Sequence, residues 1–198
     1  MSKTLLIGSS NLDKAAELNR LLDGLDWEVK SLRDYPPVEE PEETEKTFEA
    51  NALLKARYYS ARFGVPCVAD DSGLEVDALN GDPGVYSARY AGEDCTYDDN
   101  NAKLLDALKD VPDDKRGARF VCCAALVLDD GQYIIERGEM GGRILRRCRG
   151  KNGFGYDPLF VPEGHEKTYA EMTADEKHVI SHRAIAFNKM RDRLKERS

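Results

Sequence analysis

The sequence predicts an α/β protein with a mixed β-sheet and flanking helices. Three observations support this class: short apolar runs that end in turn residues, amphipathic stretches between those runs, and an Asp130-Gly131 pair between two strand-like segments. Strands that alternate with helices are typical of βαβ units, and an Asp-Gly turn adds a hairpin. Because 198 residues suit one domain and no repeat or linker is evident, we expect a single domain over residues 1–198.

The chain begins with a predicted strand–helix–strand unit. Thr4–Ile7 is a continuous apolar run, which is typical of a buried strand. Apolar residues at steps of three and four predict a helix over 12–25, with Ser10 or Asn11 as its N-cap. Trp27–Leu32 is predicted to be the second strand.

A proline-containing acidic stretch over 34–46 predicts a loop before the second helix. Helical spacing runs from Phe48 to Phe63 and stops at Gly64. The next apolar residues, 67–69, predict a strand that ends at Asp70-Asp71-Ser72-Gly73.

The second half is predicted to be irregular over 80–93, helical over 98–108 and strand-like over 118–128 and 133–136, with a basic loop over 146–157. Thr173-Ala-Asp-Glu176 matches a capping box that starts a helix near 174. The last helix is predicted to bury Ala184, Phe187, Met190 and Leu194.

Composition excludes several classes of protein. The formal net charge of −8 argues against nonspecific binding to nucleic acid, and no apolar run is long enough to span a membrane. The cysteines never occur as CxxC and the histidines never as HExxH, so we expect neither a disulfide framework nor a zinc site. We therefore expect a soluble, cytoplasmic protein without a leader segment.

The first candidate site is Ser9-Ser10-Asn11-Leu12-Asp13-Lys14, at a strand-to-helix junction. The amides and dipole of a helix N-terminus attract anions, and Lys14 adds a full charge. Simple helix capping explains the same residues, so both interpretations stay open. Neither a GxxxxGK[ST] loop nor a GxGxxG motif occurs in the sequence.

The second candidate is the carboxylate pair Asp70-Asp71 at a predicted strand end. Hard oxygen ligands of this kind suit Mg²⁺, whereas an Asp/Ser/Gly turn is the alternative. The acidic run over 39–45 is either a solvated face or the source of one more metal ligand. Asn51 and Lys55 share a helix face, which is either an exposed polar stripe or directed at phosphate.

The third candidate combines the basic loop that begins at Arg146 with Phe154-Gly155-Tyr156-Asp157. Cations for phosphate and rings for a base suit a nucleotide, whereas a surface loop anchored by two aromatic residues is the alternative. Lys177 and Ser181-His182-Arg183 follow between two predicted helices.

Together these segments resemble one family. Residues 9–14 resemble its TGNxxK opening, and Thr47–Ala56 resembles its TFxENAxLKA helix. The other matching segments are Ala69–Leu79, Pro83–Tyr90, Gly153–Pro158 and Ser181–Arg183. The match runs in order from residue 3 to about 190, and the chain resembles the inosine triphosphate pyrophosphatases, also called dITP/XTP pyrophosphatases.

The resemblance implies Mg²⁺-dependent hydrolysis of ITP, dITP and XTP to the monophosphate and pyrophosphate. It also implies an elongated two-lobed fold with a central cleft, a homodimer, and no nucleic-acid or membrane partner. By position, residues 9–14 and Lys55 would bind the triphosphate, and Glu42 and Asp71 would bind the metal. Asp71 would also be the general base. The remaining substrate contacts implied are Ser72, Phe154, Gly155, Tyr156, Asp157, Lys177, His182 and Arg183.

The sequence departs from the family pattern at three places, and one matched residue bears on the choice of base. Ser9-Ser10 stands where the family has Thr-Gly, Cys148 where a proline is frequent, and His178 where another polar residue is frequent. Arg183 has only donors, so it suits the 6-keto group of a deaminated purine rather than the amine of adenine. A nucleotide sensor without activity and a Maf-like hydrolase of other nucleotides are the alternatives.

Overall fold

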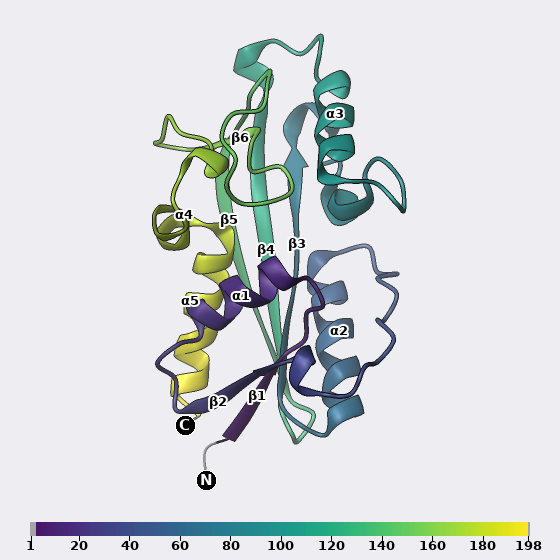
Figure 1. Cartoon of the computed structure of the whole chain (residues 1–198), viewed down its shortest axis with the longest axis vertical. Helices are drawn as coiled ribbons and strands as arrows, with labels where there is room; N and C mark the ends of the chain where they lie inside the picture. Colours follow the sequence, from purple (N-terminus) through teal and green to yellow (C-terminus); the bar gives the residue numbers. More distant parts are fainter. Residues whose placement is uncertain (1–2, 198) are drawn as a thin grey trace. The chain divides into compact units, whose positions relative to one another are not determined.

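The computed structural model describes residues 3–197, apart from the side chain of Asp13. Within this range six strands form one sheet in the order β2-β1-β3-β4-β5-β6 (Figure 1). Their bounds are β1 Lys3–Ile7, β2 Trp27–Ser31, β3 Cys67–Val76, β4 Gly117–Val127, β5 Tyr133–Ile144 and β6 Phe160–Pro162. Strand β1 pairs in parallel with β2 and β3, and β5 pairs antiparallel with β6. The predicted α/β class with a mixed sheet is confirmed.

Helices occur where the periodicity predicted them. They are α1 Leu12–Leu21, α2 Phe48–Phe63, α3 Tyr97–Ala107, α4 Ala174–Ile180 and α5 His182–Lys195. Short 3₁₀ turns cover Leu32–Asp34, Asp77–Leu79, Gly84–Arg89, Asp113–Lys115 and Tyr169–Glu171. No helix in the described range is long and apolar enough to cross a bilayer.

Local chemistry explains several helix ends. The Asn11 side chain accepts from the Lys14 amide and caps α1, and Thr47 caps α2 by accepting from the Ala50 amide. Gly64 ends α2 with φ of 66°, a conformation that glycine adopts without strain. The capping box at Thr173 is formed as predicted.

Two strand predictions were wrong in length. Strand β3 continues through Asp70 and Asp71 to Val76, so the two carboxylates lie within the strand and not at its end. Strand β5 extends to Ile144, well beyond the four residues expected, and β6 was not predicted. Polar residues inside paired strands mask the apolar alternation from which strands are inferred.

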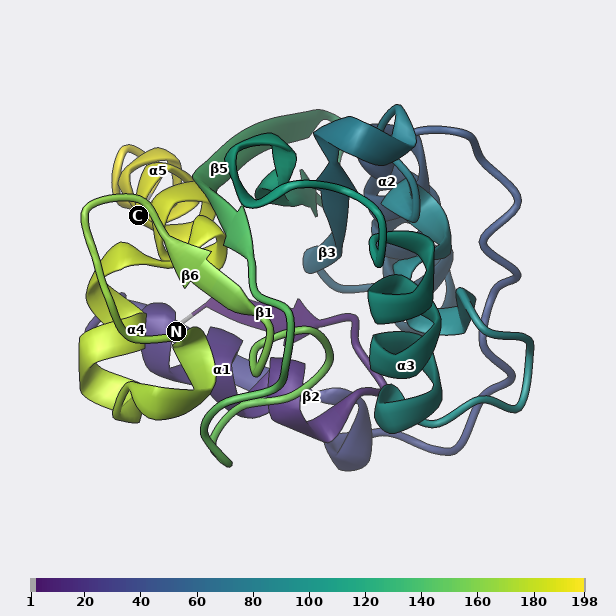
Figure 2. The same ribbon diagram turned by 90° about the horizontal axis from the view of Figure 1, so that it is seen from above.

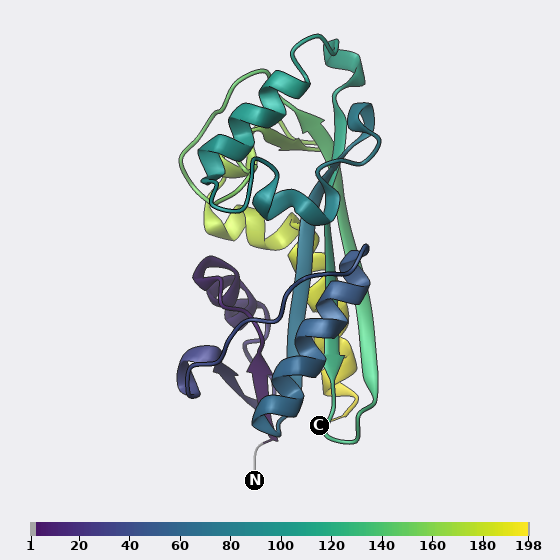
Figure 3. The same cartoon turned by 90° about the vertical axis from the view of Figure 1, so that its right-hand side faces the viewer.

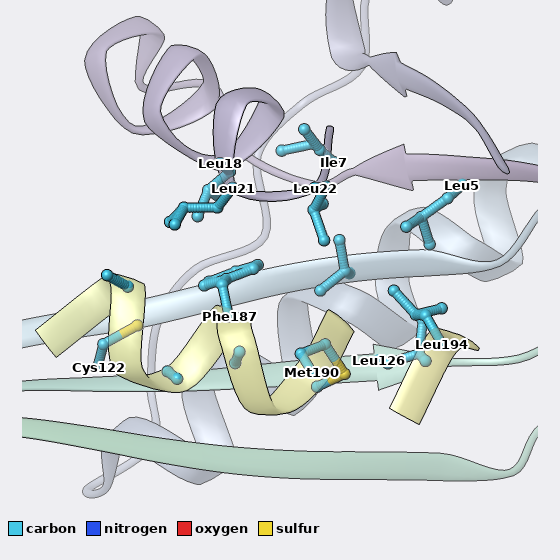
Figure 4. Close-up of a cluster of buried hydrophobic side chains, with 14 of the residues drawn as sticks. Leu5, Ile7, Leu18, Leu21, Leu22, Cys122, Leu126, Phe187, Met190 and Leu194 are labelled. Atoms are coloured by element: carbon cyan, nitrogen blue, oxygen red, sulfur yellow. The ribbon is translucent and has the colours of Figure 1, made fainter. Parts of the chain in front are cut away.

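The chain divides into two compact units. Unit 1 contains the described residues through Asp71, residues 122–138 and those from Arg183 onward, and unit 2 contains residues 72–121 and 139–182. In unit 1, leucines of α1 and the apolar face of α5 pack on one face of β1, β3 and β4 (Figure 4). Helix α2 lies against β3 (Figure 3), where Tyr59, Cys67 and Leu6 form a second cluster.

Unit 2 has its own core. Apolar side chains of β3, α3, β4 and β5 pack with Tyr156, Phe160 and Tyr169, and β6 lies beside β5 (Figure 2). The guanidinium of Arg116 is buried here and donates to the carbonyls of Leu108, Ile144 and Leu145. Since these bonds join the end of α3 to the end of β5, they fix the start of the basic loop.

Candidate active site

The sheet order of unit 1 places the first candidate segment beside β3. Strand β1 lies between β2 and β3, and the chain leaves β1 toward β2 before it returns to β3. Such a reversal creates a ligand site at the carboxyl ends of parallel strands. The Gly8 amide donates to the Val68 carbonyl (2.8 Å), so the loop that follows Gly8 begins close to Asp70.

Gly8 is required by close packing. A Cβ atom at this position would lie 2.8 Å from both the Cys67 Sγ and the Tyr59 Cδ2 atoms. Beyond it, Ser9 is half-buried, Ser10 is exposed and the Leu12 side chain is 55% exposed. The first turn of α1 has amides without intrahelical acceptors, which suits an anion.

Asp70 lies at the centre of the first ionic cluster. Its buried Oδ2 atom is 3.6 Å from Lys14 Nζ and 3.4 Å from Arg183 Nε. Arg183 Nη1 also pairs with Glu17 Oε2 of α1 at 3.1 Å. Helices α1 and α5 are therefore both tied to β3 through Asp70, and the Arg183 guanidinium is held in one orientation.

Asp71 lies in a second cluster, formed with α2. Asn51 Nδ2 donates to Asp71 Oδ2 (3.2 Å), and Lys55 Nζ is 3.6 Å from Asp71 Oδ1. Lys55 also forms a very short ion pair with Glu43. Burial, reinforced by the Glu43 and Asp70 carboxylates, raises the pKa of Asp71 despite the two lysines. Burial opposes the charge of Lys55, but the carboxylates outweigh it and raise the pKa of its ammonium.

The two adjacent carboxylates point to opposite faces of the sheet, as successive residues of a strand must. The use of Asp70 and Asp71 as one ligand pair stays a prediction, and in the structure the two carboxylates have different cationic partners, Lys14 and Lys55. Glu42 is exposed, whereas its neighbour Glu43 is half-buried and contacts Lys55. Asp71 and Glu43 are thus the carboxylates that the structure brings to the same lysine.

These residues fit a hard divalent cation that is shared with a substrate. Among residues 3–197, no group of three or more His, Cys, Asp and Glu side chains forms a cage for a metal. Mg²⁺, however, is usually held by one or two carboxylates together with substrate phosphates and waters. Burial is the main cause of the raised pKa of Asp71, and a bound cation would stabilise the charged form of this carboxyl.

In unit 2, Lys177 and Asp157 form a buried pair under an aromatic ring. Asp157 Oδ2 accepts from Lys177 Nζ (2.6 Å) and from the Phe154 amide (2.9 Å). Lys177 Nζ lies 5.0 Å from the centre of the Phe154 ring and 5.3 Å from that of Tyr169. Phe154 is half-buried, and its ring centre lies 6.1 Å from that of Tyr97.

The neighbouring residues of this segment have anchoring contacts. Tyr156 is buried and its hydroxyl donates to the Ser87 carbonyl (3.0 Å), so its ring belongs to the core. The Gly155 carbonyl accepts from Asn101 of α3 at 3.0 Å. His182 is also buried in unit 2, stacked on Phe120 with ring centres 4.7 Å apart. Ser72 is half-buried on β3.

Two arginines of the basic loop, Arg146 and Arg149, form ion pairs and hydrogen bonds with other parts of unit 2. Arg146 pairs with Asp113 and donates to the carbonyls of Lys109 and Val111. Arg149 pairs with Glu171 and donates to the Glu166 carbonyl. These contacts favour the interpretation of the loop as an anchored surface segment over that of a phosphate cradle.

Sequence reasoning missed three residues that the structure places in these clusters. Glu17 lies three residues after Lys14 on the same helix face, a spacing that indicates a shared site. Glu43 could not be distinguished from its acidic neighbours without the loop conformation. Asn101 carries no sequence signal that we recognise. The Asp13 side chain, predicted as a substrate contact, lies outside the described part of the chain.

Comparisons with known proteins identify the family of the chain. A family model described as the Ham1 family matches residues 5–193. The dITP/XTP pyrophosphatase of Elusimicrobium minutum is 49% identical over 96% of this chain and 99% of its own. That of Nocardia farcinica is 52% identical over 92% of this chain and 90% of its own.

Solved structures agree as well. A HAM1 protein from Coxiella burnetii superposes with a TM-score of 0.90 at 40% identity, covering 98% of this chain and 99% of that one. The nucleoside-triphosphatase, dITP/XTP pyrophosphatase of Mycobacterium abscessus gives 0.78 at 48% identity, covering 94% of this chain and 98% of that one. The chain belongs to the Ham1 family.

Proposed function

We propose that this protein hydrolyses the non-standard purine triphosphates ITP, dITP and XTP to the nucleoside monophosphate and pyrophosphate. The observation that carries the proposal is the buried Asp71, placed between the amide of Asn51 and the ammonium of Lys55. A carboxylate held between a donor and a cation has the parts needed to orient a water beside a phosphate. The names of the similar proteins supply the substrate class.

Unit 1 supplies the residues for the triphosphate. The N-terminus of α1 with Ser9 and Ser10 provides donors to phosphate oxygens, and Lys14 and Lys55 neutralise charge on the departing pyrophosphate. Asp71 orients the attacking water and accepts its proton, a role that its raised pKa suits.

Asp71 would hold Mg²⁺ with a carboxylate of the acidic run. The resemblance points to Glu42 for this second ligand, and Glu43 is the acidic-run carboxylate that pairs with Lys55. When bound, Mg²⁺ supplies Lewis-acid stabilisation of the phosphate oxygens.

A second group of residues is proposed to contact the base. The exposed side of Phe154 provides a stacking surface, and Asp157 with Lys177 holds the backbone of that segment. Ser72 and His182 are further contacts under this proposal. Arg183, oriented by Asp70 and Glu17, would donate to the 6-keto group that distinguishes hypoxanthine and xanthine from adenine.

Product analysis tests the proposal directly. ITP, XTP, GTP and ATP are each incubated with Mg²⁺ and with EDTA, and the products are separated. We expect the inosine and xanthosine monophosphates and pyrophosphate, formed only with metal. Absence of turnover, or release of orthophosphate from every nucleotide, would contradict it.

Three parts of the proposal have tests of their own. In ¹⁸O water, label in the monophosphate indicates attack at the α-phosphorus, and label in pyrophosphate refutes it. Retention of the wild-type preference for ITP over ATP in Arg183→Ala would refute the assignment of Arg183. A homodimer in the cytoplasm is the expected state, which light scattering and cell fractionation test.

A further inference from the structure

Asn51 has more hydrogen bonds than its place on a helix requires. It lies in the first turns of α2 and is only 1% exposed. One side-chain N–H donates to Asp71 Oδ2 (3.2 Å), and the other contact of Nδ2 is the Glu45 carbonyl (3.3 Å). The Oδ1 atom accepts from the Glu45 amide at 3.0 Å. The side chain therefore uses donors and acceptor together.

The contacts with Glu45 fix the acidic run. Asn51 binds both the amide and the carbonyl of this one residue, in the manner of a paired strand, and Glu45 is two residues from Glu43. Glu43 in turn pairs with Lys55, whose ammonium lies 3.6 Å from Asp71. Asn51, Glu43, Lys55 and Asp71 thus form a closed ring of contacts in which Asn51 joins the loop to the strand.

Other residue types would not make this ring. Aspartate has no N–H to donate and would place a third carboxylate against Asp71, whereas leucine would leave the Glu45 amide and carbonyl without the side-chain partners they have here. Thr47 already caps the N-terminus of α2, so the start of this helix does not require the side-chain amide of Asn51. The contacts with Asp71 and Glu45 therefore account for asparagine at position 51.

We infer that Asn51 is a positioning residue that sets the separation between the Asp71 carboxylate and the acidic run, and thereby the affinity of the site for a divalent cation. The inference rests on the proposed function, because the proposed reaction requires the divalent cation. Asn51 touches neither metal nor substrate in this role. It acts through Asp71 and through the backbone of Glu45.

The test measures binding of Mn²⁺ to the intact protein by electron paramagnetic resonance, together with the Mg²⁺ concentration that half-activates ITP hydrolysis. The variants are Asn51→Ala, which removes the three bonds by shortening the side chain, and Asn51→Leu, which removes them with a branched side chain of the same number of heavy atoms. The matched control is Thr47→Ala, which weakens the same end of α2 but leaves every bond of Asn51. Thermal unfolding is recorded for all four proteins.

Loss of an outer-shell partner typically weakens metal binding by about 10- to 100-fold, and we expect that range for both Asn51 variants. Thr47→Ala should lower the melting temperature yet bind Mn²⁺ as the wild type does. The inference is overturned if either Asn51 variant binds Mn²⁺ within about twofold of wild type, or if Thr47→Ala shows the same loss. A wild-type protein that neither binds Mn²⁺ nor hydrolyses ITP would overturn the proposed function itself, a result visible before any variant is made.

Discussion

Asp70 and Asp71 are consecutive in the chain, yet each faces a different lysine on a different side of β3. Asp70 Oδ2 is 3.6 Å from Lys14 of α1, and Asp71 Oδ1 is 3.6 Å from Lys55 of α2. The side-chain alternation of a strand therefore gives two neighbouring carboxylates separate tasks. Asp70 ties α1 and α5 to β3, and Asp71 is the residue to which we assign the chemistry.

Replacement of Asp71 by Asn should reduce kcat for ITP by about 10²- to 10⁴-fold, the usual contribution of a positioned proton acceptor. The fold should persist, because the asparagine side chain has the same shape as that of aspartate. The substitution also removes a buried charge that the protein disfavours, as the raised pKa of Asp71 indicates. Steady-state kinetics and thermal unfolding measure both effects. Asp114→Asn, an exposed substitution, should leave both unchanged, and activity of Asp71→Asn within about tenfold of wild type would contradict the assignment of Asp71 as base.

Metal removal should abolish hydrolysis, and restored Mg²⁺ should recover it. A cation that binds only the folded protein also stabilises it, by about 2.7 kcal/mol at a concentration 100 times its dissociation constant. We expect Mg²⁺ to raise the melting temperature of the wild type but not that of Asp71→Asn. An equal rise in both proteins would place the cation elsewhere.

Gly8→Ala should destabilise the protein by about 1–3 kcal/mol, as overpacking of a core does. The added methyl group meets the Cys67 sulfur and the Tyr59 ring at 2.8 Å, and both atoms are in a buried cluster. Urea unfolding measures the loss. Gly24→Ala is a useful contrast, since nothing lies within 4 Å there and only the positive φ of 77° opposes the side chain.

The Lys177–Asp157 pair calls for a double-mutant cycle. Breaking a buried pair by removing one partner typically costs about 3–5 kcal/mol, since it leaves the other charge buried alone. Lys177→Met and Asp157→Asn should therefore each destabilise unit 2, and the double variant should recover part of that loss. Strict additivity in chemical unfolding would show that the 2.6 Å contact contributes nothing. The double variant should still have a raised KM for ITP, because the Phe154 ring loses the Lys177 ammonium beside it.

Stability should fall in acid partly through the capping boxes. The amide of Thr173 lowers the pKa of Glu176 by hydrogen bonding to its carboxylate, and Lys167 adds to the effect. A group whose folded pKa lies below its unfolded value stabilises the fold above the unfolded pKa, and this contribution is lost as the pH falls through the folded one. Glu176→Gln should therefore melt earlier than wild type at pH 7, and the difference should shrink as the solution is acidified. A difference that stays constant on acidification would rule out this carboxylate as the cause.

Local signals predicted much of the fold. Helix α2 is bounded by a Thr cap and a left-handed glycine, both visible in the sequence, and its limits were predicted to the residue. The full length of β3 was not predicted, because the Asp-Asp-Ser-Gly segment in its middle has the composition of a turn. The place of the two carboxylates inside the sheet depends on ion pairs with Lys14 and Lys55, which lie far away in the chain.

The sequence predicted which segments contribute to the candidate site, but not in every case which residue of a segment does so. Within unit 1, Lys14 lies beside Asp70 and Lys55 lies beside Asp71. The choice between Glu42 and Glu43 depends on which way a loop turns, and that turn is held by Asn51 through the Glu45 backbone. Neither charge nor hydrophobic period encodes such a contact. The roles of these residues in binding stay predictions until the variants are measured.

The division of the chain into units has a consequence for its inheritance. Unit 1 is assembled from three stretches of sequence and unit 2 from two, with borders between Asp71 and Ser72 and between His182 and Arg183. A genetic exchange that imports one continuous piece of coding sequence cannot carry over unit 1 without also bringing or interrupting unit 2. Variation in this lineage is therefore expected to accumulate by point substitution, with loop insertions tolerated only away from these borders, rather than by the swapping of modules.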